Sequence, residues 1–220
     1  MPLLLGAVAD DYTGASDLAN TLTRNGLSTI QTIGVPSAGF DVGEVEAVVV
    51  ALKIRSVEAG SAVEAASAAY DWLAARGARH VMYKVCSTFD STDAGNIGPV
   101  ADALRVRAGT TCALVTPAFP ETGRTVYLGR LFVGDALLHE SPLKDHPLNP
   151  MRDSNLVSVL QRQSKAPVGL VDLTTVAQGG EAVGRRLREL GDQGCGAAIA
   201  DAVFERDLEA IGDAAARQAF

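Results

Sequence analysis

A hydroxyl-rich loop is the most chemically suggestive part of the chain. Residues 84–99 read KVCSTFDSTDAGNIGP, which places hydroxyl and carboxyl side chains before a Gly-Asn-Ile-Gly turn: Ser87, Thr88, Asp90, Ser91, Thr92 and Asp93. The mostly apolar residues 80–85 predict a buried strand, and a helix is predicted from residue 94 onward. In open α/β sheets, ligands bind beyond the carboxyl ends of strands, where such a loop can exchange hydrogen bonds with a small polyol. The alternative interpretation is a helix N-cap within a long polar loop.

Two adjacent carboxylates follow the first apolar run. Asp10 and Asp11 stand in ADDYTGASD, between a strand predicted at 3–9 and a predicted helix. Like charges within a few Å raise one carboxyl pKa, and such pairs persist where they bind a hydroxylated ligand, a cation or a proton in transit. The alternative is structural, with Asp11 or Thr13 as the helix N-cap and Asp17 as a solvated acid in the first turn.

Basic residues are expected near the same sheet edge. Lys53 and Arg55 follow the third apolar run, Lys84 lies in the fourth, and Arg124 stands in PETGRT. A guanidinium or ammonium group would recognise the carboxylate of an acid sugar, with Arg preferred for a two-point contact. Taken singly, each cation is also compatible with a surface charge of little energetic effect.

The composition is that of an ordinary globular α/β protein. Hydrophobic residues make up 47% of the 220 residues and charged residues 20%, and a chain of this length can bury about 70% of its unfolded surface. The formal charge of -7 opposes non-specific nucleic-acid binding, which depends on clustered Lys and Arg. The LLLGAV run is too short for a signal peptide or a membrane span, so no membrane association is predicted.

Cysteine and histidine spacing opposes metal and disulfide sites. Cys86, Cys112 and Cys195 are widely spaced without a CxxC pair, and the histidines form no i, i+4 pair. We therefore predict no metal site, no disulfide framework and a location in the reducing cytoplasm. The chain contains neither GxxxxGKS/T nor GxGxxG, so another polypeptide segment would have to bring any nucleotide.

Apolar runs alternate with helical patterns along the chain. The runs predict strands at 3–9, 30–35, 47–52, 80–85, 112–116, 126–133, 168–173 and 197–200, and the intervals predict helices at 14–25, 57–76, 94–107, 153–163, 175–190 and 204–218. This order predicts an α/β fold, a mostly parallel sheet with helices on both faces in a Rossmann-like three-layer sandwich. The proline-containing segment 117–150 departs from the rhythm, as lids, binding loops and interface arms do. No linker or repeat divides the chain, so one domain over 1–220 is expected.

Four segments, in this order, resemble the four-carbon acid sugar kinase family. They are ADDYTGASD, KVCSTFDSTDAGNIGP, PAFPETGRTVYLGRLFV and HPLNPMRDSNL, and the likeness extends over nearly all of the chain. CSTFDST followed by GNIGPV is similar to the 3-oxo-tetronate 4-kinase branch, and Cys86 stands where the threonate and erythronate kinases carry an aspartate. The resemblance implies an acid-sugar-binding N-terminal domain, with the C-terminal nucleotide-binding domain of the family absent from this chain.

This resemblance implies the substrate-binding domain of an ATP-dependent kinase that phosphorylates the 4-hydroxyl of 3-oxo-tetronate. Asp10 or Asp11 is expected to accept the proton, and the second domain is expected to hold ATP and Mg²⁺. The residues expected to bind the sugar are Thr13, Arg55, Lys84, Ser87, Thr88, Asp90, Thr92, Asn96 and Arg124. The expected partners are the acid sugar, the nucleotide-binding domain and a second copy in a homodimer, and this chain alone is expected to be inactive.

Two other functions are compatible with the same residues. A stand-alone module would bind an acid sugar without chemistry, which the lack of a nucleotide motif favours. An aldolase-like or isomerase-like enzyme would use Lys84 as a Schiff-base lysine, because this residue lies in an apolar strand. Borohydride trapping of Lys84 with a keto acid would distinguish this second function from the others.

Overall fold

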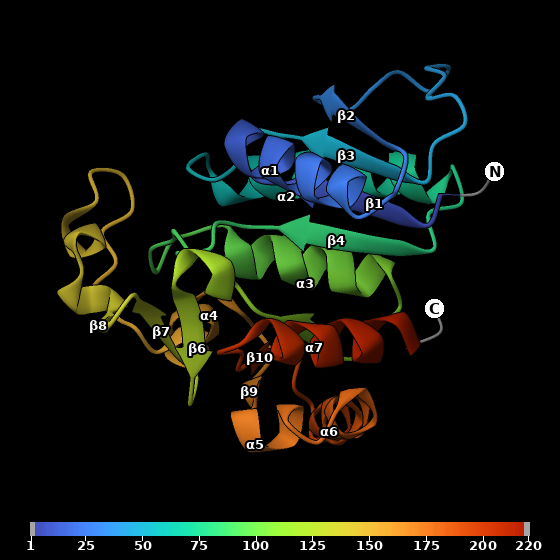
Figure 1. Ribbon diagram of the computed structural model, residues 1–220. Coiled ribbons are helices and arrows are strands. Elements are labelled where there is room, and N and C mark those ends of the chain that lie inside the picture. The colour runs from blue at the N-terminus through green and yellow to red at the C-terminus, as the bar shows by residue number, and fades with distance from the viewer. Residues whose placement is uncertain (1–2, 218–220) are drawn as a thin grey trace. The chain divides into compact units, whose positions relative to one another are not determined.

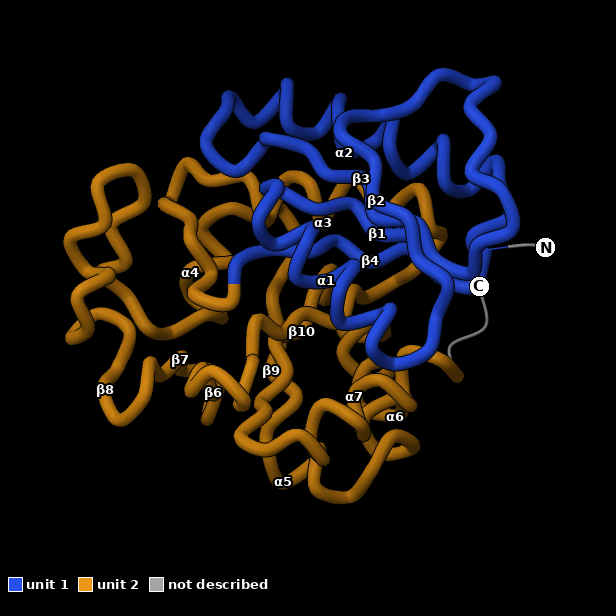
Figure 2. The backbone as a smooth tube through the Cα atoms, turned by 45° about the horizontal axis from the view of Figure 1, so that its top comes forward, with its two compact units in different colours: residues 1–86 blue, residues 87–220 orange. Residues whose placement is uncertain are grey.

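Two parallel sheets organise the chain, one in each of its two units. The computed structural model describes residues 3–217, and the units are Met1–Cys86 and Ser87–Phe220 (Figure 2). Both sheets consist of strands that alternate with flanking helices, so the α/β fold class predicted from the sequence is confirmed. None of the helices within residues 3–217 is long and apolar enough to cross a membrane.

The first unit is a four-stranded parallel sheet in the order β2-β3-β1-β4. Its elements are β1 (Leu5–Ala9), α1 (Tyr12–Arg24), β2 (Thr29–Ile33), β3 (Ala47–Ala51), α2 (Ala59–Ala74) and β4 (His80–Lys84). Alternate residues of a strand face opposite sides of a sheet. Ala7 and Ala9 pack towards α1, whereas a Cβ at Gly6 would lie 3.0 Å from Leu73 of α2. The two helices therefore cover opposite faces of this sheet (Figure 1).

The second unit contains a three-stranded parallel sheet in the order β5-β10-β9. Its strands are β5 (Ala113–Val115), β9 (Val168–Val171) and β10 (Ala197–Ala200), and its longer helices are α3 (Ile97–Arg107), α4 (Leu156–Gln163), α6 (Gly180–Asp192) and α7 (Glu205–Arg217). Helix α4 contacts α3, β9 and β10, and α6 packs along α7. Ala198 and Ala200, alternate residues of β10, join the apolar faces of α6 and α7 in one core.

One predicted strand is a hairpin. The sequence predicts a single strand over 126–133, but the structure has antiparallel β6 (Arg124–Tyr127) and β7 (Arg130–Val133), with β8 (Ala136–Leu137) beside β7. Leu128 and Gly129 form the turn with φ angles of 48° and 70°. Two successive positive φ angles make a tight hairpin turn, and leucine is an unusual residue for the first of them. The proline-containing segment 117–150 also includes three 3-10 turns, η1 (Pro120–Thr122), η2 (Leu138–Glu140) and η3 (Pro142–Asp145).

A buried carboxylate holds this hairpin turn in place. Asp201 is 0% exposed and follows β10. Its carboxylate accepts hydrogen bonds from the backbone N–H groups of Leu128 at 2.8 Å, Gly129 at 2.8 Å and Leu173 at 3.0 Å. Burial raises the pKa of Asp201, and the three backbone donors oppose that rise. Because Leu173 begins α5 (Leu173–Val176), one side chain connects the hairpin, the end of β10 and a helix.

Replacing Asp201 with Asn is expected to lower the free energy of unfolding by about 1–3 kcal/mol. The amide NH₂ group would face at least one of the three backbone donors and leave it buried without an acceptor. Urea unfolding of the two chains would measure the change. Asp135→Asn, at an exposed position after β7, is the matched control and should leave the midpoint unchanged. An unchanged midpoint for Asp201→Asn would contradict this account of the turn.

Other element boundaries differ from those predicted. The helix predicted at 175–190 is two helices, because Gly179 has a φ angle of 93° and separates α5 from α6. Helices α3 and α4 begin at Ile97 and Leu156, three residues later than predicted, with Asn96 and Asn155 as their N-caps. The predicted end of the last helix, Gln218, lies outside the described residues.

Candidate functional site

The first candidate site lies in the first unit, where β1, β3 and β4 end. The backbone N–H of Asp10 donates to the carbonyl of Lys84 at 3.0 Å, and that of Ile54 donates to the carbonyl of Asp10 at 3.0 Å. These bonds hold Asp10, the residue after β1, between the last residue of β4 and the segment that follows β3. They bring the segments that carry Asp10, Arg55 and Lys84 together at the carboxyl edge of the sheet.

Arg55 holds Asp10 in a two-point contact. Its Nε lies 2.9 Å from Oδ2 and its Nη2 lies 2.8 Å from Oδ1 of Asp10, and Nη2 also lies 3.1 Å from Oδ1 of Asp11. The Asp10 side chain is 2% exposed and that of Arg55 21%. Burial raises the pKa of Asp10, and the hydrogen bonds from Arg55 oppose that rise. Burial would lower the pKa of Arg55, but the hydrogen bonds and charge of Asp10 raise it above its ordinary value. The fork fixes Asp10 in one orientation and engages both of its oxygens.

Asp11 has a structural role and is still accessible. It is the N-cap of α1, and its Oδ1 accepts a hydrogen bond from the backbone N–H of Gly14 at 2.8 Å, as the structural alternative predicted. Its side chain is 28% exposed, and both of its contacts use Oδ1. Oδ2 is therefore available to a ligand. Thr13 and Asp17 are exposed in the first turns of the same helix.

Lys84 lies against the start of α1. Its Nζ donates to the carbonyl of Val85 at 2.7 Å. A Cβ at Gly14 would lie 2.6 Å from Oδ1 of Asp11 and 3.3 Å from Nζ of Lys84. Glycine at this position thus allows the carboxylate and the ammonium group to approach the first turn together. Lys53 is exposed and makes no ion pair with a described carboxylate.

Sequence reasoning missed Tyr83, which it assigned only to the apolar strand. Its hydroxyl is buried and has no hydrogen-bond partner in the part of the chain that the structure describes. Burial and the negative charge of Asp10 raise the pKa of Tyr83 well above its usual value. The phenol therefore remains protonated and keeps a hydrogen-bond donor close to the Asp10 carboxylate.

The second candidate site lies in the second unit, in the hydroxyl-rich loop. The side chains of this loop are more buried than a solvated polar loop would be: Thr88 5%, Asp90 8%, Ser91 4% and Asn96 3% exposed. Thr88 Oγ1 donates to Oδ1 of Asp90 at 2.6 Å. The loop is therefore ordered by its own polar side chains and by the unit around it.

Phe89 anchors the loop in a strained conformation. It is 0% exposed and has a φ angle of 54°, which a bulky residue adopts at a cost of about 1–3 kcal/mol. Burial of the ring offsets that cost and fixes the backbone between Thr88 and Asp90. The sequence predicts only the polar content of the loop, because a positive φ angle at phenylalanine has no local sequence signal.

Gln163, at the end of α4, clamps the same loop. Its Nε2 donates to Ser91 Oγ at 2.8 Å and to the carbonyl of Thr92 at 2.7 Å, and its Oε1 accepts from the backbone N–H of Gly98 at 2.9 Å. One amide side chain therefore connects both ends of the turn that precedes α3. Sequence reasoning missed this residue, since its partners lie 65 to 72 positions away along the chain.

A cavity of about 530 Å³ opens beside this loop within the second unit. It is lined by Ser91, Thr92, Asp93, Ala94, Pro150, Met151, Arg152, Asp153, Val159 and Arg162. Of the predicted sugar-binding residues, Thr92 is part of this lining. The two arginines come from the HPLNPMRDSNL segment and from α4, and neither was among the predicted sugar-binding residues.

Arg162 connects the two acidic residues of the lining. Its Nε lies 2.6 Å from Oδ1 of Asp93, and its Nη1 lies 3.0 Å from Oδ2 of Asp153. The hydrogen bond to Asp93 is the main cause of a raised Arg162 pKa. Arg152 is 73% exposed and pairs with Asp145 at 3.1 Å, an exposed pair that a ligand can displace at little cost. The lining thus offers hydroxyls, carboxylates and guanidinium groups to a small polar ligand.

The structure does not bring Arg124 into this cavity. Arg124 lies in β6, where its Nη1 donates to the carbonyl of Thr122 at 2.6 Å. Ser87 is half-buried at the start of the loop, and Asn96 caps α3 without a side-chain hydrogen bond to the helix. Within residues 3–217, no group of three His, Cys, Asp or Glu side chains is arranged to hold a metal ion, and Cys86, Cys112 and Cys195 form no disulfide with one another.

Comparison with protein families gives a match over most of the chain. Residues 5–220 match the family described as sugar-binding N-terminal domain. Among curated proteins, the 3-oxo-tetronate kinase of Methylobacterium radiotolerans is 70% identical over 214 residues, which are 97% of this chain and 50% of that protein. The 3-oxo-tetronate kinase of Cupriavidus necator is 55% identical over 215 residues, again 97% of this chain and 50% of that protein. The chain thus spans about half the length of the curated relatives it matches.

Solved structures share the fold. The crystal structure of a putative tRNA synthase from Salmonella typhimurium has a TM-score of 0.94 at 43% identity, and the match covers 97% of this chain and 51% of the Salmonella chain. A domain of unknown function from Bordetella bronchiseptica, crystallised as a domain-swapped dimer with bound citrate, has a TM-score of 0.78 at 27% identity. This match covers 97% of the present chain and 52% of the Bordetella chain.

Proposed function

Because the chain belongs to the family of sugar-binding N-terminal domains, we propose that it binds a four-carbon acid sugar as the substrate half of an ATP-dependent kinase. The proposed reaction is phosphorylation of the 4-hydroxyl of 3-oxo-tetronate. The observation that carries the proposal is the alignment of nearly the whole chain, at 46% to 70% identity, with the N-terminal half-length of proteins named 3-oxo-tetronate kinase. The Bordetella protein was crystallised with citrate, a hydroxylated carboxylate, which supports an anionic, hydroxylated ligand.

The contacts in the first unit suggest different roles for Asp10 and Asp11. Both oxygens of Asp10 are engaged by Arg55 and its side chain is buried, so we assign it the role of holding that guanidinium. Asp11 has a free Oδ2 and is more exposed, which suits a proton acceptor for the substrate hydroxyl. As the new O4–P bond forms, the O4–H bond breaks, the proton passes to Asp11, and the electron pair of the broken P–O bond leaves with ADP.

The cations and the loop are proposed to bind and orient the sugar. Lys84 has ammonium protons beyond the one donated to Val85, and these suit the substrate carboxylate. Arg55 and Arg124 are proposed, with Lys84, to bind the same carboxylate. The proposed partners of the hydroxyl and keto groups are Ser87, Thr88, Asp90 and Thr92, together with Thr13 and Asn96. Phosphoryl transfer has a loose transition state, so orientation of the 4-hydroxyl is the main task of these residues.

We propose that ATP and Mg²⁺ are bound by a second half of the enzyme, which this chain does not include. The relatives are about twice as long as this chain, which supports a nucleotide-binding half as the partner. ATP would supply the phosphoryl group there. Mg²⁺ is expected to accompany ATP in that second half. The wide spacing of the three cysteines supports a reducing compartment such as the cytoplasm. The domain-swapped dimer of the Bordetella protein supports a homodimer, which light scattering would test.

A thermal-shift titration of the 220-residue chain tests the proposed ligand. 3-Oxo-tetronate is expected to raise the midpoint, because a ligand at a hundred times its Kd stabilises a fold by about 2.7 kcal/mol. Threonate and erythronate should act more weakly and ATP not at all. A shift with ATP alone would reverse the assignment of the two halves. A shift with the sugar, combined with a two-domain protein that does not turn over, would favour the stand-alone binding module.

A further inference from the structure

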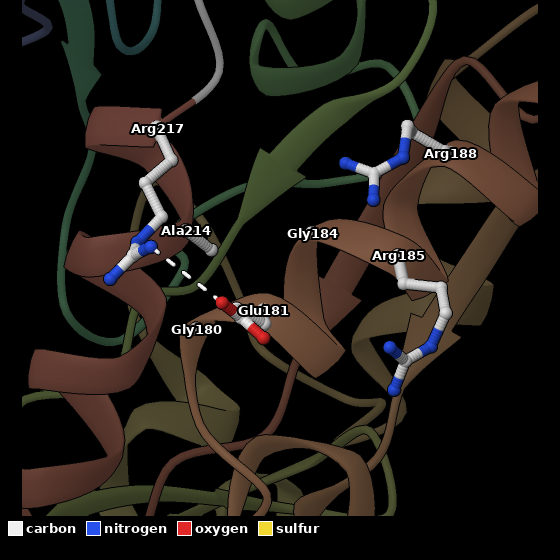
Figure 3. A pocket seen from close by; sticks show the side chains of 7 residues that line it. All are labelled: Gly180, Glu181, Gly184, Arg185, Arg188, Ala214 and Arg217. Atoms are coloured by element: carbon white, nitrogen blue, oxygen red, sulfur yellow. Dashed lines mark ion pairs between the residues drawn. The ribbon is translucent and has the colours of Figure 1, made fainter.

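A second cavity lies between α6 and α7 in the second unit. It measures about 280 Å³ and is lined by Gly180, Glu181, Gly184, Arg185, Arg188, Ala214 and Arg217 (Figure 3). It shares no lining residue with the cavity beside the hydroxyl-rich loop. Neither the expected sugar-binding residues nor the proposed reaction uses any of its side chains.

Small residues form the floor of this cavity. Gly180, Gly184 and Ala214 are buried and carry no side chain beyond Cβ. Arg188 extends back over Gly184, because a Cβ there would lie 3.6 Å from Arg188 Nη1. Arg185 and Arg188 are three positions apart, so they share one face of α6. Figure 3 shows their guanidinium groups on one side of the cavity and Arg217 of α7 on the other.

The charges around the cavity are unbalanced. Arg217 pairs with Asp213 at 2.8 Å and with Glu181 at 3.9 Å. Arg185 and Arg188 line the cavity and make no ion pair with any carboxylate in residues 3–217. The chain as a whole has an excess of acidic residues, with a formal charge of -7. Two guanidinium groups without carboxylate partners therefore line a cavity on an otherwise acidic protein. Helix α6 begins at Gly180, but the carboxylate of Asp213 lies against that residue, so an anion is expected beside Arg185 and Arg188 rather than at the helix N-terminus.

We propose that this cavity is a second binding site, for a small phosphate ester. Guanidinium groups recognise phosphate through paired N–H donors, and the absence of a side chain at Gly184 leaves room for the phosphate beside Arg185 and Arg188. The volume is at the lower end of the range for small-molecule sites, which fits a compact phosphorylated ligand. Glu181 lies between the arginines in Figure 3 and would repel a ligand with further negative groups on that side.

Isothermal titration of the 220-residue chain with inorganic phosphate and glycerol phosphate, at low ionic strength, tests this site. We expect saturable binding, with an affinity that falls about tenfold or more in Arg185→Ala/Arg188→Ala, since tenfold corresponds to 1.4 kcal/mol. Arg186→Ala is the matched control, because Arg186 lies on the same helix, pairs with Glu189 and does not line the cavity. Its affinity should remain that of the unchanged chain.

Three results would overturn the proposal. They are an absence of saturable binding, an equal loss in Arg186→Ala, and a loss in Arg152→Ala/Arg162→Ala as large as in the α6 double variant. The last result would assign the phosphate to the cavity beside the hydroxyl-rich loop. Because the acid sugar is titrated separately by thermal shift, failure of this site and failure of the proposed function are distinguishable.

Discussion

Replacement of Arg55 with Met is expected to lower the free energy of unfolding by about 3–5 kcal/mol, because it leaves a buried carboxylate without its cation. Asp10 is 2% exposed and both of its oxygens are bonded to Arg55. Methionine keeps much of the volume of the arginine stem but removes the fork. Urea unfolding of the 220-residue chain would measure the loss, and acid-sugar binding should be lost with it.

Asp10→Asn and the double variant Asp10→Asn/Arg55→Met complete a double-mutant cycle for this ion pair. The double variant should be less destabilised than the sum of the two single changes, since it buries no unpaired charge. Arg152→Met is the matched control, because its pair with Asp145 is exposed at both ends, 73% and 63%, and its loss should be barely measurable. Additive effects of the two single changes would contradict the account of Asp10 and Arg55 as one buried unit.

The instability of Arg55→Met should also depend on pH. Burial already raises the pKa of Asp10, and without Arg55 this pKa rises further above its unfolded value. The folded chain then binds the proton more tightly than the unfolded chain, so stability is lost as the pH rises through the folded-state pKa. Both chains lose stability equally until the pH passes the Asp10 pKa of the unchanged chain, which burial already raises. The gap between the variant and the unchanged chain should therefore open above that pKa and widen as the pH rises to the still higher Asp10 pKa of the variant.

Sequence patterns predicted the parallel strands well and the irregular segments poorly. The apolar runs of β1 and β3 are buried by the helices of their own unit, so period and hydrophobicity were sufficient. The run of β4 also forms a strand, but the prediction that it is buried was wrong, because this strand lies at the edge of its sheet and Met82 is 42% exposed. The β6-β7 hairpin was missed because its turn contains Leu128 and depends on Asp201, which lies more than seventy positions away. Gly179 separates α5 from α6 and was the one break with a local sequence signal.

In the candidate sites, too, the sequence predicted the residues with a local pattern and missed the contacts that depend on residues distant in the chain. Asp10, Asp11, Arg55 and Lys84 were predicted at one sheet edge because the carboxyl ends of parallel strands meet there. The sequence could not show that Arg55 would occupy both oxygens of Asp10, since that contact depends on how the segment after β3 folds back. Gln163 and Arg162 were missed because their partners are distant in the chain and their own helix has no unusual pattern.

Asp11→Asn is expected to reduce turnover by about 10²- to 10⁴-fold in a two-domain enzyme that carries this chain as its N-terminal half. This expectation rests on the proposed kinase activity and on the free Oδ2 of Asp11. Asparagine can still accept the hydrogen bond from the N–H of Gly14, so the cap of α1 and the fold should be preserved. Steady-state rates should show a lower kcat with little change in KM, because the lost group acts on the proton rather than on ground-state binding.

Asp17→Asn provides the matched control for this change. Asp17 is an exposed carboxylate on the same helix with no part in the candidate site, so its removal should leave turnover unaltered. If Asp11→Asn instead raises KM with kcat retained, Asp11 is a substrate ligand and the proton goes elsewhere. If Asp11→Asn is fully active while Asp10→Asn folds and is inactive, the buried carboxylate is the base. In that case Arg55 must release Asp10 when substrate binds, because in the present structure both oxygens of Asp10 are engaged.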